Sequence, residues 1–223
     1  MRLSDAEHAL VTAAVTEAER ATSGEIVAIV AARSDTYGDV AAHWAVIAML
    51  SVLTLLAIRP SLAEWFYFAT SNAWVPTVPA GDLFLVALLL LSATFVLARI
   101  VLAVTPIRLL LTPETTKARR VHRRALELFR AAVEQRTRAA TGVLLYVSLA
   151  ERRAEIVADH AIHSRVEQAV WGEAMHLLVE AIRDGRAGEG VARAIERVGA
   201  VLAEHFPRDG ADRNELPDRL IEL

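Results

Sequence analysis

The sequence has no cysteine among its 223 residues. This absence excludes disulfide bonds, zinc sites with thiolate ligands, iron–sulfur clusters and thiol nucleophiles. Lysine is almost absent too, because Lys117 stands alone beside many arginines, and the formal net charge is −3. Binding to nucleic acid calls for a basic surface patch, so the charge balance gives no reason to expect a nucleic-acid partner. The abundance of arginine and alanine is typical of a protein from a GC-rich bacterial genome.

Short catalytic signatures are missing as well. The chain contains neither the HExxH motif of a metalloprotease nor a Ser-His-Asp elbow. The Gly-rich stretch GRAGEG, at 185–190, follows a predicted helix rather than a strand, and it lacks the Lys-Ser/Thr pair of a phosphate-binding loop. It therefore predicts a turn between two helices. The sequence therefore predicts helices and strands more clearly than it predicts a reaction.

Long apolar runs explain why 54% of the residues are hydrophobic and why the mean hydropathy is +0.35, which is high for a soluble domain. One run covers residues 40–58 and contains WAVIAMLSVLTLLAI; the other covers residues 82–104 and contains LFLVALLLLSATFVLARIVLAV. A helix of about 20 apolar residues crosses the roughly 30 Å of hydrocarbon in a bilayer. The two runs therefore predict a transmembrane hairpin. The alternative, a pair of buried core helices, fits less well because the second run is apolar on every face.

The segment between the two runs, SLAEWFYFATSNAWVPTVPAG, is rich in aromatic residues. Aromatic rings gather at the headgroup level of a bilayer, so we expect an interfacial loop here. The connecting loop has only Arg59 as a basic residue. The basic residues that follow the second run are Arg108, Lys117, Arg119, Arg120, Arg123 and Arg124. The positive-inside rule then places both termini in the cytoplasm and the aromatic loop outside, with the hairpin in the inner membrane of a bacterium.

Each flank of the hairpin predicts a helix followed by a buried strand. Residues 1–39 begin with an amphipathic helix, marked by a capping box at Ser4 and Glu7, and continue into the strand GEIVAIVAA. Residues 105–207 predict a helix over 113–140, the strand GVLLYVSLA, a polar turn, the strand AEIVAD and two more helices. The tail is polar, and it is either extended against the domain or disordered.

These segments define the predicted domain organisation. Residues 1–39 and 105–207 form one split domain, residues 40–104 form the hairpin, and residues 208–223 form the tail. Neither flank alone can cover a sheet, and the hairpin returns the chain to the same side of the membrane. The predicted fold class is therefore α/β (α+β), with a small sheet flanked by helices and interrupted by a two-helix transmembrane hairpin.

Candidate site residues gather where the predicted strands end. Asp159 ends a strand, and His160 and His163 follow it at a spacing that divalent metals accept when both face one point. Asp35 and Asp39 follow the first strand, and they would add hard ligands if they lie at the same edge of the sheet. The alternative is ordinary capping, in which the Asp159 carboxylate accepts helix N–H bonds and both imidazoles are solvated.

The stretch TGVLLYVSLAERRAEIVADHAIH resembles the TPM domain family, because it has a helix-ending Gly, an apolar strand, a basic turn and a second strand that ends in a loop. IRDGRAGEGVARAIERVG is similar to the closing helix pair of the family, and SGEIVAIVAARSDTYGDVAAHW resembles its first strand and the helix that follows. In many members the domain is unbroken and lies outside the cytoplasm. Their Gly-rich loop after the last strand is DHAIHSRV here, which puts any ligand contact through that loop in doubt.

This resemblance implies two kinds of chemistry. Plant members are linked with acid phosphatase activity, and Asp159 would then be the catalytic residue, with Arg152, Arg153 or Arg165 holding the phosphoryl oxygens. A divalent metal such as calcium would be the cofactor, held in the family-like arrangement by the carboxylates that follow the strands.

Three functions compete at this point. The preferred one is a non-enzymatic accessory or scaffold protein, anchored in the lipid bilayer, whose cytoplasmic domain acts on or with another membrane protein. The alternatives are a metal-dependent acid phosphatase and a modulator of a channel or transporter that acts through the hairpin itself. A homo-oligomer is compatible with each of them.

Overall fold

The structure is a computed structural model of the chain, and it describes residues 3–71, 76–134, 141–166, 170–208 and 220–223. The chain divides into two compact units. The first, which we call the sheet unit, consists of Met1–Thr36 and Glu114–Leu223; the second, the hairpin unit, is Tyr37–Pro113. The hairpin unit is thus inserted into the sheet unit, and each unit is described by itself.

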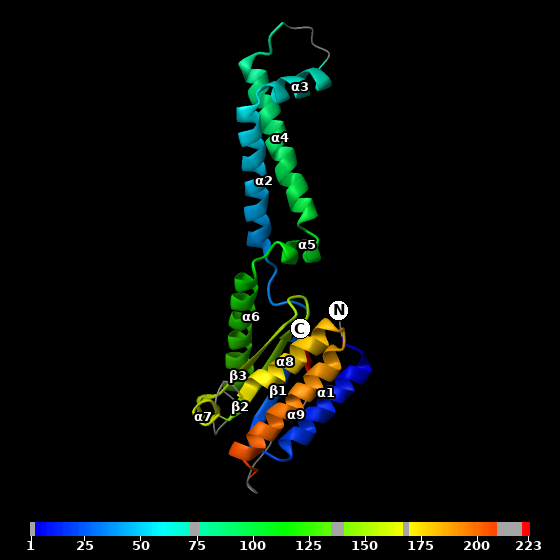
Figure 1. The fold of residues 1–223 in the computed structure, drawn as a ribbon, viewed down its shortest axis with the longest axis vertical. Coiled ribbons are helices and arrows are strands. Elements are labelled where there is room, and N and C mark those ends of the chain that lie inside the picture. The colour runs from blue at the N-terminus through cyan, green and yellow to red at the C-terminus, as the bar shows by residue number, and fades with distance from the viewer. Residues whose placement is uncertain (1–2, 72–75, 135–140, 167–169, 209–219) are drawn as a thin grey trace. The chain divides into compact units, whose positions relative to one another are not determined.

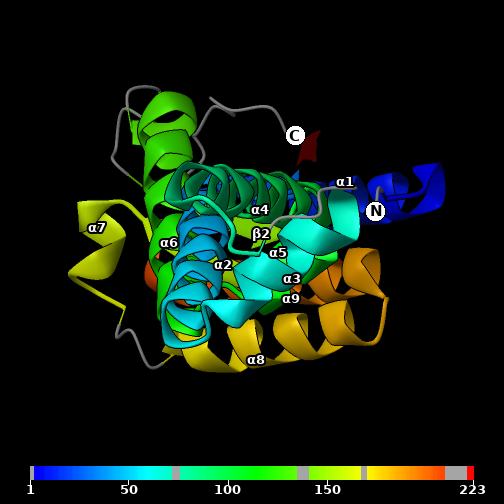
Figure 2. The same ribbon diagram turned by 90° about the horizontal axis from the view of Figure 1, so that it is seen from above.

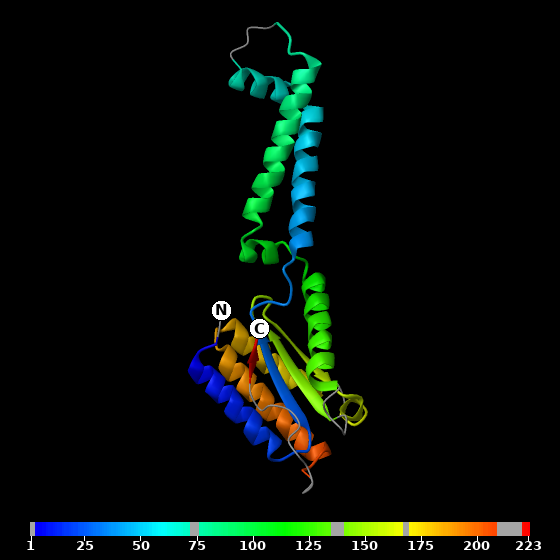
Figure 3. The ribbon, with the colours of Figure 1, turned by 180° about the vertical axis from the view of Figure 1, so that it is seen from behind.

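A four-stranded sheet organises the sheet unit, with the strand order β3-β2-β1-β4 (Figure 3). The strands are β1 (Glu25–Ala31), β2 (Gly142–Ser148), β3 (Arg153–Ala158) and β4 (Ile221–Glu222). β1 and β2 run parallel, β3 runs antiparallel to β2, and β4 runs parallel to β1. The predicted union of a strand before the hairpin with strands after it is therefore confirmed.

Helices cover both faces of this sheet, which explains why β1 and β2 are buried along their whole length. The helices α1 (Asp5–Glu19), α8 (Val170–Arg183) and α9 (Ala187–His205) pack on one face. The helix α6 (Glu114–Phe129) and the π-helical turn η1 (Arg130–Glu134) pack on the other. Alternate residues of each strand enter the two cores. A shift of one residue along a strand would move its side chains from one core to the other. The burial pattern therefore fixes the register of the strand pairing.

The helices of the first face approach one another closely at glycines. A Cβ atom added at Gly199 of α9 would lie 2.5 Å from the Cβ of Ala18, at the end of α1. A Cβ atom added at Gly190 would lie 2.6 Å from the Cβ of Ala181 on α8. Both distances are far below a van der Waals contact of about 3.5–4.0 Å. The close approach of α9 to α1 and α8 therefore requires glycine at these two positions.

The two ends of the chain meet on the side of β1 that faces away from β2. The predicted capping box at the start of α1 is confirmed, because the Ser4 and Glu7 side chains bond each other's backbone amides. At the other end, the N–H of Leu223 donates to the carbonyl oxygen of Val30 at 2.9 Å. The Glu222 carboxylate lies 3.1 Å from Nε2 of His8. The last residues of the tail are thus extended against the domain, while residues 209–219 lie outside the described part.

The hairpin unit contains α2 (Gly38–Ile58), α3 (Ser61–Thr70), α4 (Ala80–Val101) and α5 (Thr105–Leu110). α2 and α4 lie side by side (Figures 1 and 2). Both are long and apolar enough to cross a membrane, as the two apolar runs predict. A helix in a soluble core would be mostly buried, but α4 has no buried residue. Large apolar side chains such as Phe84 and Leu88 are 77% and 60% exposed.

The connection between α2 and α4 differs from the expected interfacial loop, because it contains the helix α3. Ten residues free of glycine and proline follow Pro60, which is the N-cap, so nothing interrupts the helix. The side chains of Trp65 and Phe68 on α3 are exposed. Trp74, which belongs to the same aromatic segment, lies outside the described residues.

Candidate functional site

The Asp159 side chain bonds the backbone of a neighbouring strand rather than the helix that follows it. Its backbone N–H donates to the carbonyl oxygen of Gly142 at 2.9 Å, and its Oδ2 accepts the N–H of Gly142 at 3.0 Å. It precedes the one-turn helix α7 (His160–His163), but its side chain makes no capping bond to that helix. Asp159 is the N-cap residue of α7, but the predicted capping bond of its carboxylate to that helix is wrong. Because the carboxylate is buried and bonded to the backbone of β2, it fastens the end of β3 to the beginning of β2.

The two histidines after Asp159 point to no assembled metal centre. His160 and His163 are both exposed. Among the residues that the structure describes, no three His, Asp or Glu side chains are grouped so that they could hold a metal ion. Metal binding at this corner, with calcium or another divalent ion, stays a prediction.

The structure separates Asp35 from Asp159. The parallel register pairs Glu25 with Gly142 at one end of β1 and β2, and Ala31 with Ser148 at the other. Asp159 lies beside the first end, whereas Asp35 follows the second. Seven residues at about 3.3 Å each put roughly 20 Å between these ends. The expectation of a shared sheet edge is wrong, because β3 runs antiparallel to its neighbour and carries Asp159 back to the start of β2.

Asp35 and Asp39 have different surroundings. The Oδ2 atom of Asp35 accepts a hydrogen bond of 2.9 Å from Arg120 and lies 3.5 Å from a guanidinium nitrogen of Arg123, both on α6. Asp39 belongs to the hairpin unit, in the first turn of α2. The Asp35 carboxylate is thus an ion-pair partner of α6.

A buried polar network, which the sequence interpretation missed, lies at the end of β1 and β2 near Asp35. The Ser34 Oγ atom lies 2.9 Å from the Tyr146 hydroxyl and donates to the Ser148 Oγ atom, also at 2.9 Å. The Ser148 hydroxyl donates to Glu151 at 2.5 Å. The second carboxylate oxygen of Glu151 accepts the backbone N–H of Ser34 at 3.0 Å. Since Ser34 and Ser148 each donate onward, Tyr146 is the donor to Ser34.

The electrostatics of this network suit a structural role. Burial raises the pKa of the Tyr146 phenol, although hydrogen bonds with Ser34 and Ser148 oppose the rise. The phenol therefore stays protonated at neutral pH and acts as a donor rather than as a base. The network ties the segment after β1 to the turn between β2 and β3. One signal could have revealed it: Ser148 is a polar residue at a buried strand position, three residues before a carboxylate.

The three arginines proposed to bind phosphoryl oxygens are dispersed. Arg152 lies in the turn before β3, with a φ of 51°, and Arg153 donates to Glu114 at 3.0 Å. Both are at the opposite end of β3 from Asp159. The Arg165 guanidinium lies 4.9 Å from the centre of the Phe206 ring. Asp159 is thus not brought together with Arg152 or Arg153.

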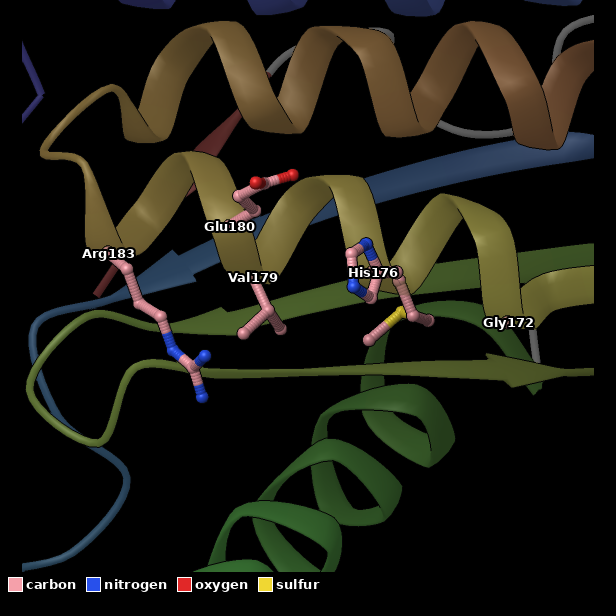
Figure 4. Close-up of a pocket in the computed structure, with 6 residues that line it drawn as sticks. Gly172, His176, Val179, Glu180 and Arg183 are labelled. Carbon is pink, nitrogen blue, oxygen red and sulfur yellow. The ribbon is translucent and has the colours of Figure 1, made fainter.

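One hollow runs along the face of α8, with a volume of about 440 Å³ (Figure 4). The residues that line it are Gly172, Met175, His176, Val179, Glu180 and Arg183. Figure 4 shows Val179 and Arg183 pointing from α8 toward β3. His176 in this hollow is exposed. The hollow offers an apolar surface with charged groups at its margins.

Comparison with known proteins identifies the domain. Residues 104–201 match the TPM domain family model. No curated protein matches the chain. The structure is similar to the NMR structure of the BA42 protein from the psychrophilic bacterium Bizionia argentinensis, with a TM-score of 0.56 and 17% identity over 100% of this chain and 97% of that chain. At this identity the likeness shows the fold alone. The chain therefore contains a TPM domain, to whose sheet the strand β1, ahead of the matched residues, also belongs.

Proposed function

We propose that this protein is an accessory or scaffold protein of the bacterial inner membrane. In this proposal α2 and α4 span the bilayer, both termini are cytoplasmic, and the TPM domain acts on or with another membrane protein. The proposal rests on one observation: a single sheet contains strands from the chain segments before and after the apolar hairpin.

The parallel pairing of β1 with β2 is the observation that carries the proposal. The two strands pair over all seven residues, from Glu25 with Gly142 to Ala31 with Ser148. The whole hairpin unit lies between them in the sequence. Two strands of one sheet must be on the same side of a membrane, so an even number of crossings must separate them. Two spans, α2 and α4, meet this condition, whereas a single crossing would divide the sheet.

The distribution of basic residues supports the proposed orientation of the hairpin, and the exposed aromatic residues of α3 support its position in the bilayer. Arg59 is the one basic residue in the connection, whereas the chain after α4 is rich in arginine. The positive-inside rule favours a cytoplasmic sheet unit. Basic residues close to anionic headgroups contribute about 1 kcal/mol each. The exposed Trp65 and Phe68 on α3 suit the opposite headgroup layer.

The geometry of the candidate carboxylates gives no support to a metal-dependent phosphatase. The Asp159 carboxylate accepts a backbone N–H, Asp35 pairs with Arg120, and these two carboxylates are at opposite ends of the sheet. This donor set does not fit one divalent ion. No arrangement of the described residues favours the phosphatase or the channel modulator over the accessory role.

Topology can be tested with the cysteine-free chain, since any introduced thiol is the only one. Glu17→Cys on α1 and Arg193→Cys on α9 report on the two flanks, and Glu64→Cys on α3 reports on the connection; all three positions are exposed. A membrane-impermeant maleimide should label intact cells at position 64 alone, and all three positions after lysis. Labelling of positions 17 and 193 from opposite sides would contradict the proposal.

The accessory role is tested separately by in-cell crosslinking with mass spectrometry. A reproducible crosslink from the sheet unit to a specific membrane protein is expected. Replacing the hairpin by two unrelated spans should preserve this crosslink and the cellular phenotype. Loss of both with the domain still folded would instead support a modulator that acts through the hairpin.

A further inference from the structure

No residue in the described part of the chain pairs with the outer edge of β3. Asp159 N–H bonds the carbonyl of Gly142, and the antiparallel register continues from this pair. In such a ladder the hydrogen-bonding groups of successive residues point to opposite sides. The backbone groups of Arg153, Glu155 and Val157 therefore face β2. Those of the intervening residues, Ala154, Ile156 and Ala158, face away from the sheet, and within the described ranges no residue pairs with them.

Two helices flank this outer edge, one on each face of the sheet. α8 makes its main sheet contacts with β3, and α6 contacts β3 more than β2. The side chains of Ala154, Ile156 and Ala158 pack toward the α8 face. On the other face the Glu155 carboxylate lies 3.3 Å from Nδ1 of His122 on α6. The unpaired backbone groups thus lie between two helices that both sit over the edge strand.

The hollow on α8 includes Val179 and Arg183, whose side chains point from the helix toward β3 (Figure 4). Met175 and Val179 give it an apolar floor, and both are only half-buried. Arg183 lies toward the beginning of β3 and has no ion-pair partner in the part of the chain that the structure describes. Arg152, which is also exposed, precedes the same end of the strand. Two exposed arginines, Arg152 and Arg183, thus lie toward this end of the edge strand, and Glu180 lines the hollow beside them.

The spacing of the elements decides what kind of partner fits. A strand added to β3 would lie about 4.8 Å from it. A second copy that paired through its own β3 would place its own α8 over that strand. The two α8 helices would then also be only about 4.8 Å apart. Packed helices need 8–10 Å between their axes, so two copies would collide. A single extended segment without a covering helix avoids this collision.

We propose that β3 binds an extended segment of the partner protein by strand addition. The segment pairs with the backbone of Ala154, Ile156 and Ala158, places apolar side chains against the α8 hollow, and sets an acidic residue beside Arg183. This inference rests on the accessory function and deepens it, because it gives the partner a chemical description: an extended strand of alternating apolar residues with an acidic end.

The test uses the full chain in detergent micelles and a fluorescein-labelled heptapeptide, EVTVTVE, which has an acidic residue at either end. Fluorescence anisotropy measures its binding. The same peptide with N-methyl groups on two neighbouring residues should not bind, because both of its edges lose donors. Absence of binding up to millimolar peptide, or equal binding of the methylated peptide, would overturn the proposal.

Three variants locate the binding. Ile156→Pro removes an outward N–H that the sheet does not use, and proline is tolerated at such edge positions. Arg183→Glu reverses the charge at the hollow, and Arg193→Glu makes the same change on exposed α9 as a matched control. The first two should weaken binding at least tenfold, and the control should leave it unchanged. Equal weakening by Arg193→Glu would contradict a local role of Arg183.

Hydrogen exchange of the unmutated chain gives a second measurement that does not depend on how Ile156→Pro folds. Saturating peptide should slow exchange at the amides of Ala154, Ile156 and Ala158. Unchanged exchange at all three would overturn strand addition. Cellular crosslinks to a membrane protein that avoid β3 and α8 would also overturn it, while leaving the accessory function intact. Maleimide labelling of the flanks from opposite sides would remove the accessory function and leave the peptide result interpretable.

Discussion

The close contact between α1 and α9 predicts that a methyl group added at Gly199 destabilises the protein, whereas one added at Gly172 does not. In Gly199→Ala the new Cβ atom would lie 2.5 Å from the Cβ and 3.2 Å from the Cα of Ala18. The helices must separate by about 1 Å to restore an ordinary contact. Alanine gains about 1 kcal/mol in helix propensity, whereas overpacking costs about 1–3 kcal/mol. We expect Gly199→Ala to be destabilising by about 1–2 kcal/mol.

Gly172→Ala in α8 is the matched control, because no described atom, apart from its chain neighbours and the backbone of its own helix, lies within 4 Å of the added Cβ. It should be neutral or stabilising by up to about 1 kcal/mol. Ala18→Gly combined with Gly199→Ala moves the methyl group to the other helix, and the pair should show a favourable coupling of about 1–3 kcal/mol. Urea unfolding of the full chain in detergent, followed by circular dichroism, measures each difference. Wild-type stability for Gly199→Ala, or zero coupling, would refute the reasoning.

Three further changes test the polar contacts. Tyr146→Phe leaves the Ser34 hydroxyl without its buried donor, so a loss of about 1–2 kcal/mol is expected in urea unfolding, and an unchanged midpoint would count against the network. Hydrogen bonds from the backbone and side chain of Ser4 hold the pKa of Glu7 below its ordinary value of 4.5. The resulting stabilisation is present above pH 4.5 and is lost as the pH falls through the folded-state pKa, so Glu7→Gln should flatten this acid limb of the stability curve. Asp159→Ala leaves the buried backbone N–H of Gly142 without its acceptor and should lower the free energy of unfolding by about 1–3 kcal/mol. Hydrolysis of p-nitrophenyl phosphate by the wild type that is abolished in a folded Asp159→Asn variant would favour the phosphatase instead.

Much of the fold could be predicted from the sequence because it depends on long apolar patterns. The continuous apolar runs of β1 and β2 indicate strands buried on both faces, and the length of the hairpin returns the chain for their pairing. The helix α3 could not be predicted in this way. Its aromatic residues favour the membrane–water interface whether the backbone is a helix or a loop. The pattern therefore indicates where the segment lies but not its secondary structure.

The candidate site was harder to predict because it depends on strand direction. Asp35 and Asp159 both follow strands in the sequence, but only the antiparallel return of β3 decides that they lie at opposite ends. The contacts of Ser34 and Tyr146 join residues far apart in the chain. A serine after a strand is usually solvated, so its residue type alone does not indicate a buried network.

The insertion of the hairpin between β1 and β2 has a consequence for biosynthesis. Translation completes β1 first, and the proposed spans must enter the bilayer before the ribosome delivers its parallel neighbour. During that interval β1, which is apolar on both faces, has no sheet to join. Nascent chains stalled within the hairpin should therefore recruit holding chaperones, and delayed membrane insertion should lead to aggregation through this strand before any defect in the completed protein is visible.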